Sequence, residues 1–190
     1  MKSIALLLVT SLAWFTIGFA QSAPQSTASP HVWRQSQKND TARALTYTQF
    51  TLRGNFLSPP HDPVADRPVL AFDCIPGGSG SSRRKFLAAN LLVGTTLKII
   101  YVEPEEIRGT SYFPKVALRY RTDDGKEEQR QWSPGTDKTS VSIPKESVKQ
   151  LLRAHSVAIT LDDDRGSQVA MRFDLPDPTL VEQGCNVDEH

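Results

Sequence analysis

Apolar and polar residues alternate along most of the chain after Pro68, in the period-two pattern of half-buried β-strands. In VLAFDC, for example, Leu70, Phe72 and Cys74 fall on one face. The pattern predicts strands at residues 45–57, 69–74, 86–93, 97–102, 115–122, 127–132, 139–143, 156–161 and 168–175. We therefore expect a mainly β fold of about eight strands.

Helical spacing is found in two short segments. In PKESVKQLLRA, which Pro144 opens, the apolar residues Val148, Leu151 and Leu152 recur at i, i+3 and i+4. A short C-terminal helical turn is expected in PTLVEQGC, after a capping Asp177. Crossover helices of the kind that join parallel strands are missing from the pattern. We expect an antiparallel β-sandwich or a small open barrel with one amphipathic helix.

The first twenty residues open with one Lys, continue as an apolar run and end in small residues, which is typical of a signal peptide. A membrane anchor is the alternative, because the run nearly reaches the length that spans a bilayer. Residues 21–43 are mostly Ser, Gln, Pro, Ala and Thr, and are expected to form a disordered leader. Residues 44–187 are then the β-sandwich domain, and the protein is expected to be periplasmic or secreted.

Removal of residues 1–20 takes away one Lys and leaves 21 basic and 21 acidic side chains. This balance argues against nucleic acid or an anionic membrane as a general partner. We expect a monomer that is not stably inserted in a membrane once the signal peptide has been cleaved.

The chain has two cysteines, Cys74 and Cys185. Two thiols in an oxidising compartment usually pair, so we expect a disulfide that joins the C-terminal segment to an early core strand. In the chain-entropy model, such a bridge stabilises the fold by about 4–5 kcal/mol. Free thiols with redox or metal chemistry are the alternative, although the sequence has no CxxC motif.

No residue is assigned a catalytic role from the sequence, and neither a metal nor another cofactor is expected. None of the histidines lies in a GxSxG or HExxH motif. His155 lies at the end of the predicted helix, where a cation is favoured on structural grounds. A hydrolase or carbohydrate-active enzyme that uses Glu105 or Asp162 with His155 is retained as an alternative.

Two groups of residues are candidates for binding. Tyr112, Phe113 and Trp132 lie in or beside predicted loops, and aromatic side chains are common in binding hot spots. The alternative is that these aromatics cover the ends of the core. The second group lies at the basic end of the loop PGGSGSSRRK and consists of Arg83, Arg84 and Lys85. These residues could meet an acidic polymer or the acidic face of a partner.

Several segments follow one another in a recognisable layout: FDC, VALRYRTDDGKEEQRQWSPGTDKTSVSIP, LLRAHSVAITL, GSQVAMRFDL and a final Cys about ten residues later. This layout resembles the periplasmic accessory proteins of type VI secretion systems (the VasI/TagO family). The resemblance implies a small exported scaffold that assists envelope machinery without performing chemistry. The leading hypothesis is a non-catalytic exported β-domain that binds a protein or an envelope component. The alternatives are a periplasmic hydrolase and a purely structural envelope protein.

Overall fold

The computed structural model describes residues 32–41, 44–77, 84–103 and 112–185. Eleven strands and two helices lie in this part of the chain. The strands are β1 (Arg34–Asp40), β2 (Leu45–Arg53), β3 (Asn55–Ser58), β4 (Val69–Gly77), β5 (Arg84–Leu92), β6 (Ile100–Val102), β7 (Phe113–Thr122), β8 (Glu128–Pro134), β9 (Ser140–Ile143), β10 (Ser156–Asp162) and β11 (Gln168–Asp174). The helices are α1 (Lys145–Arg153) and α2 (Thr179–Cys185). The prediction of a mainly β fold is confirmed.

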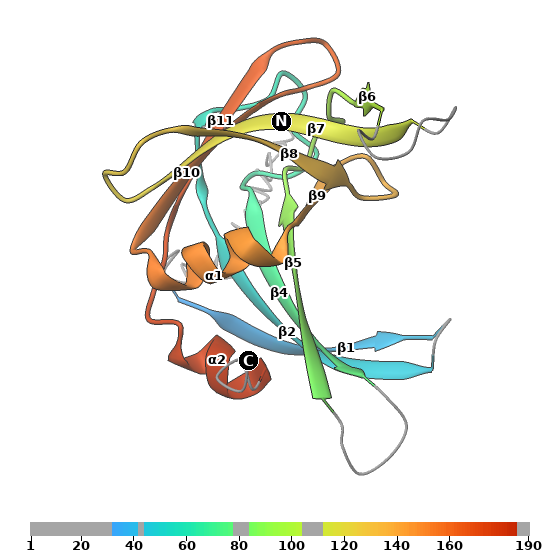
Figure 1. Cartoon of the computed structure of the whole chain (residues 1–190), viewed down its shortest axis with the longest axis vertical. Coiled ribbons are helices and arrows are strands. Elements are labelled where there is room, and N and C mark those ends of the chain that lie inside the picture. The colour runs from blue at the N-terminus through green and yellow to red at the C-terminus, as the bar shows by residue number, and fades with distance from the viewer. Residues whose placement is uncertain (1–31, 42–43, 78–83, 104–111, 186–190) are drawn as a thin grey trace, which may run out of the picture.

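All the strands belong to one antiparallel sheet, in the order β1-β2-β4-β5-β9-β8-β7-β10-β11-β3, and β6 pairs separately with β7. The sheet is bent: β7, β8, β10 and β11 lie in the upper part of Figure 1 and β1 and β2 in the lower part. The long strands β4 and β5 run between these two parts (Figure 1). The path of hydrogen-bonded strands is not closed, because β1 and β3 stand at its two ends.

A single glycine lies between β2 and β3. β2 pairs with β4, whereas β3 pairs with β11 at the opposite end of the strand order. A Cβ atom at Gly54 would lie 2.7 Å from both the Arg172 carbonyl oxygen and the Phe173 ring. Only glycine therefore fits where the chain passes from one end of the sheet to the other. The sequence pattern predicted one strand at residues 45–57, and this bend divides it into two.

The alternating residues of the predicted strands form one core. It includes Phe50 from β2, Phe72 from β4 and Ile159, Met171 and Phe173 from the upper strands, each no more than 1% exposed. Because both parts of the bent sheet supply this core, the apolar face of each part is covered by the other. Burial of one such side chain stabilises the fold by roughly 1.5–3 kcal/mol.

Both predicted helices are present. α1 follows Pro144 and buries Val148, Leu151 and Leu152, as its spacing predicted. It lies in front of β4 and β5, between the upper and lower strands (Figure 1). α2 begins where the Asp177 carboxylate accepts a hydrogen bond of 2.8 Å from the backbone N–H of Thr179. The helix packs beside β4 and β5.

The sulfur atoms of Cys74 and Cys185 lie at disulfide distance, with their Cα atoms 5.0 Å apart. Both residues are buried. The predicted connection between β4 and the C-terminal segment is therefore present, and it spans 111 residues of sequence.

The expected disordered leader at residues 21–43 is wrong for part of its length. Arg34–Asp40 form β1, which pairs with β2 over seven residues. Trp33 is buried, and its ring meets the Phe72 ring edge-on at 5.2 Å between centroids. The folded domain thus begins before residue 44. The predicted signal peptide at residues 1–20 and the leader residues 21–31, 42 and 43 lie outside the described residues.

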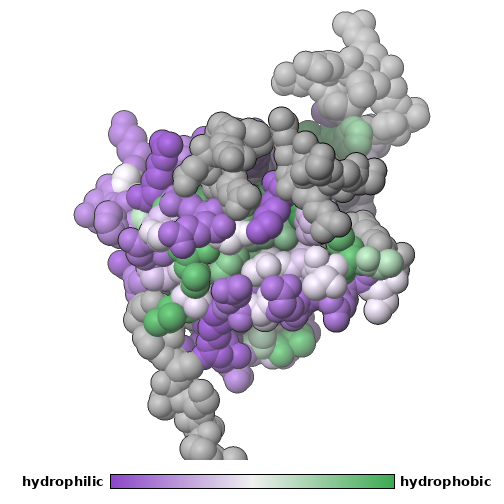
Figure 2. Space-filling model, turned by 90° about the horizontal axis from the view of Figure 1, so that it is seen from below, coloured by the Kyte–Doolittle hydropathy of each residue, from purple (hydrophilic) through white to green (hydrophobic). Residues whose placement is uncertain are grey.

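The surface is largely polar on the face seen from below in Figure 2. Hydrophobic side chains appear there as separate spots with hydrophilic ones between them (Figure 2). Scattered apolar groups of this kind are ordinary for a folded protein. Several large apolar side chains exposed on one element would be a more specific feature than these spots.

Candidate functional site

A two-stranded arm projects where β6 pairs with the first residues of β7. We call residues 100–103 and 112–115 the aromatic arm. Its register pairs Ile100 with Lys115, Tyr101 with Pro114 and Val102 with Phe113. Figure 1 shows β6 beside the end of β7, at the edge of the upper part of the sheet.

Three large aromatic side chains of the aromatic arm are exposed. Tyr101 is 67% exposed, Tyr112 60% and Phe113 48%. Directly opposite residues of an antiparallel pair point to the same face, so Tyr101 shares a face with Pro114, and Phe113 shares the other face with Val102. The arm thus presents aromatic side chains on both faces. The alternative in which Tyr112 and Phe113 cover the core is wrong.

Trp132 does not belong to this surface, and its prediction as an exposed binding residue is wrong. It pairs with Val116 on the inner face of the sheet and is 1% exposed. Its ring packs against Tyr120 at 5.7 Å between centroids. The indole Nε1 has no hydrogen-bond partner among the described residues. Trp132 therefore contributes to the core.

The sequence analysis missed Tyr101. The apolar run LKIIYV predicted a strand at residues 97–102, and Tyr101 was not among the candidate binding residues. Because Tyr101 lies between Ile100 and Val102, it points to the opposite face of the strand from both. The side chains of Ile100 and Val102 are half-buried, whereas that of Tyr101 is exposed.

The basic candidates are only partly described. Arg83 lies outside the described residues, and for Arg84 only the backbone, the first residue of β5, is described. Lys85 is exposed, and its Nζ donates a hydrogen bond of 2.6 Å to the Gly184 carbonyl oxygen. Lys85 therefore links β5 to α2, and a binding role for these three residues stays a prediction.

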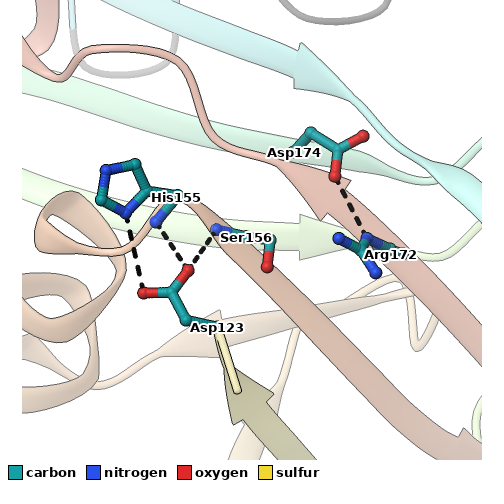
Figure 3. A network of polar contacts seen from close by, with 5 residues as sticks. All are labelled: Asp123, His155, Ser156, Arg172 and Asp174. Carbon is teal, nitrogen blue, oxygen red and sulfur yellow. Dashed lines mark hydrogen bonds and ion pairs between the residues drawn. The ribbon is translucent and has the colours of Figure 1, made fainter. Parts of the chain in front are cut away.

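His155 takes part in a polar network that joins two loops (Figure 3). The Asp123 carboxylate accepts hydrogen bonds from the backbone N–H groups of His155 (2.9 Å) and Ser156 (2.8 Å). The two hydrogen bonds hold the pKa of Asp123 below its ordinary value, and the bond from Ser156 has the larger effect. The His155 Nδ1 lies 3.9 Å from the second carboxylate oxygen. The Asp123 side chain thus fixes the β7–β8 turn to the start of β10.

The network contains Asp, His and Ser, but it lacks the geometry of a catalytic triad. The Ser156 side chain points away from the His155 ring (Figure 3). Nucleophilic catalysis requires the serine hydroxyl within hydrogen-bond reach of the imidazole. The nearby Arg172–Asp174 contact, at 3.1 Å, is a separate ion pair on β11.

The acid and base of the hydrolase alternative are not brought together. His155 precedes β10 and Asp162 ends it, which places them roughly 20 Å apart along the strand. Asp162 instead lies 3.7 Å from the Lys98 ammonium. Glu105 lies outside the described residues. The described geometry gives His155 no carboxylate partner for catalysis other than Asp123, which is occupied by backbone N–H groups.

No group of three or more His, Cys, Asp or Glu side chains in the described residues could hold a metal ion. Neither described helix is long and apolar enough to span a bilayer.

Comparisons with known proteins leave the family of the chain open. No model of a protein family, no curated protein and no solved structure matches the chain. The fold and the site define a mainly β protein with an aromatic arm, and the resemblance to type VI accessory proteins stays a prediction. The assignment of a function therefore rests on the geometry of the chain.

Proposed function

We propose that this chain is a non-catalytic exported β-domain that binds a partner protein through the aromatic arm. Its bent sheet would form an open barrel or a sandwich around one core. The observation that carries the proposal is the exposure of Tyr101, Tyr112 and Phe113 on one two-stranded arm. Export to the periplasm or beyond is supported by the signal-like first twenty residues and by the cysteine pair at disulfide distance.

Aromatic rings in such positions are suited to protein recognition. A tyrosine combines a large apolar ring with a hydroxyl group, and its ordering sacrifices little side-chain entropy. Removal of one exposed ring from water on binding contributes roughly 1.5–3 kcal/mol. Exposed rings on both faces of the arm could therefore contact a partner that lies along it.

The backbone of β6 favours a protein over another envelope component. Among the described strands, β6 pairs only with β7. Its second edge can therefore offer backbone N–H and C=O groups to an extended partner segment, which would add a strand to the arm. A polypeptide matches this pattern of donors and acceptors, and Tyr101 and Phe113 would contact its side chains on the two faces.

The test uses the exported chain without residues 1–20. A biotinylated sample would capture partners from an envelope extract, each captured protein would be identified and purified, and its Kd would be measured directly. We expect Tyr101→Ala with Tyr112→Ala to weaken binding by about 30-fold or more, the effect of losing one hot spot. Phe86→Ala is the matched control, because Phe86 is 62% exposed on β5, away from the arm.

Four results would contradict the proposal. An unchanged Kd for the arm variant would place the interface elsewhere. A loss of affinity in Phe86→Ala equal to that in the arm variant would also exclude a specific role for the arm. If no purified envelope protein binds the chain, the structural envelope protein becomes the better hypothesis. Turnover of an envelope polymer that Asp162→Asn abolishes would favour the hydrolase.

A further inference from the structure

A hollow of about 610 Å³ lies on the outer face of the sheet, over β7, β8 and β10. We call it the outer hollow. The outward-facing side chains that line it are those of Ala117, Arg119, Gln129, Gln131, Thr160 and Asp162. Its volume falls within the range of small-ligand sites, roughly 300–1,000 Å³.

The strand register explains why the surface is hollowed at this point. One row across the sheet consists of Gln129, Arg119 and Thr160, which are paired through β7. In the next row Ala117 pairs with Gln131. The Ala117 methyl group is much shorter than its neighbours, so it forms a floor between longer polar side chains. The hollow is therefore built into the pairing of regular strands.

The charges around the outer hollow are paired with one another. Arg119 lies 3.4 Å from the Glu127 carboxylate, and Asp162 lies 3.7 Å from the Lys98 ammonium. Arg130 pairs with the core-facing Leu118, so its side chain points to the other face of the sheet, where it forms an ion pair with Glu128. Each charge thus has an opposite charge beside it. The hollow offers no net field that would attract a strongly charged polymer.

The remaining polar groups can both donate and accept hydrogen bonds. The amides of Gln129 and Gln131 and the Thr160 hydroxyl make no side-chain hydrogen bond to another described residue. An amide has an acceptor oxygen and a donor nitrogen, and a hydroxyl serves as both. A ligand rich in hydroxyl groups matches this set, because each of its hydroxyls is also donor and acceptor.

We propose that the outer hollow binds a short stretch of an uncharged oligosaccharide. The neutral balance of charges and the unpaired amides select a polyhydroxylated, neutral ligand over an acidic one. A protein segment is less suitable here, because β7 is paired on both sides by β8 and β10 and has no free backbone edge at these positions. This site goes beyond the proposed protein-binding function and shares no residue with the aromatic arm.

The experiment measures binding of neutral trisaccharides to the exported chain by NMR titration and calorimetry. The probes are maltotriose, cellotriose and triacetylchitotriose, with trigalacturonate as the charged comparison. We expect at least one neutral probe to bind with a Kd on the order of 1 mM or below and with little dependence on salt. Gln129→Ala with Gln131→Ala should weaken that binding by about tenfold, from the loss of two hydrogen bonds.

A second variant tests the shape of the hollow. Ala117→Leu should fill its floor and abolish binding of the same probe. Ala158→Leu, on β10 outside the lining, and Gln183→Ala, on α2, are the matched controls and should bind normally. Thermal unfolding checks that each variant is folded, and NMR line positions of core methyl groups give a second check.

Several outcomes would overturn the inference. These are the absence of binding by all three neutral probes, binding that Ala117→Leu leaves unchanged, and preferred binding of trigalacturonate or of an acidic peptide. Tyr101→Ala with Tyr112→Ala should leave trisaccharide binding intact. That variant separates the two proposals, because the protein-binding arm and the outer hollow can then fail independently.

Discussion

Asp73 shows how a single carboxyl group can be enclosed on the outer face of a sheet. It lies on β4, points away from the core-facing Phe72 and Cys74, and is nevertheless only 8% exposed. Its two carboxylate oxygens accept hydrogen bonds from the Gln49 side chain (2.8 Å) and the Asn90 side chain (3.4 Å). Burial raises the pKa of Asp73, although these two hydrogen bonds act in the opposite direction.

The raised pKa of Asp73 predicts a pH-dependent stability. The folded chain keeps the proton of Asp73 to higher pH than the unfolded chain, so the free energy of unfolding falls as the pH rises through the pKa of the folded state. Asp73→Asn removes the buried charge and keeps a similar shape. We expect this variant to unfold at a higher temperature than the parent at neutral pH. The difference should vanish below the ordinary pKa of 3.8.

Asp137→Asn is a control for which the opposite change in stability is expected, because the pKa of Asp137 is lowered and not raised. The Asp137 carboxylate accepts hydrogen bonds from the backbone N–H groups of Thr139 (3.0 Å) and Ser140 (3.2 Å), and that of Thr139 is the main cause of its lowered pKa. The Asp137 carboxylate stabilises the fold at pH values above its ordinary pKa. This stabilisation is lost as the pH falls through the lowered pKa of the folded state. Thermal unfolding at a series of pH values should show Asp137→Asn to be less stable at neutral pH. Equal melting curves for both variants and the parent would contradict the two assignments.

At the scale of single residues, the alternation predicted burial better than it predicted the candidate site. The alternation in the predicted strands 156–161 and 168–175 places Ile159, Met171 and Phe173 on their apolar faces, and all three are buried. Trp132 ends a mostly polar strand and was a candidate for binding, with a place in the core as the alternative. Its pairing with Val116 puts it on the inner face. A contact across strands is not encoded in the local period of either strand.

At the scale of elements, the strand without an apolar pattern was the one missed. β1 has the sequence RQSQKND, and six of its seven residues are exposed. It is held by its backbone pairing with β2 and by the buried Trp33 that precedes it. By contrast, α1, β10 and β11 each have a clear apolar face, and they were predicted within a residue or two. Pattern analysis detects burial, and β1 buries almost nothing.

α2 offers a prediction about close packing. A methyl group at Gly184 would overlap the ring of Phe50, which is buried in the core. The helix has little room to move away, because Val181 and Cys185 are buried beside β4. We expect Gly184→Ala to lower the free energy of unfolding by about 1–3 kcal/mol, as measured by urea denaturation. Gln183→Ala, at the exposed neighbouring residue, should change it little, and similar losses in both variants would contradict the packing argument.

At the scale of the whole molecule, the topology depends on contacts that no short stretch of sequence specifies. The pairing of β3 with β11 joins residues more than a hundred positions apart. The sequence therefore predicted antiparallel strands, but it could not choose between a sandwich and an open barrel. The bend at Gly54, which connects the two ends of the strand order, is also invisible in the alternation.

The cysteine pair gives a prediction about the whole fold. Cys74→Ala with Cys185→Ala should lower the free energy of unfolding by about 4–5 kcal/mol, because the unfolded chain would regain the entropy of a loop that spans 111 residues. Guanidinium denaturation with and without reductant measures the effect. The parent should lose stability in reductant, whereas the double variant should not respond. A parent that titrates two free thiols without reductant would show that the bridge is not formed.

The open strand order leaves β1 as a terminal strand, where an unpaired backbone edge could recruit a second copy of the chain. Arg34 and Lys38 are exposed along this strand, and an incoming strand would have to accommodate their charges. The same composition that makes β1 inconspicuous in the sequence thus opposes edge-to-edge association with a second copy.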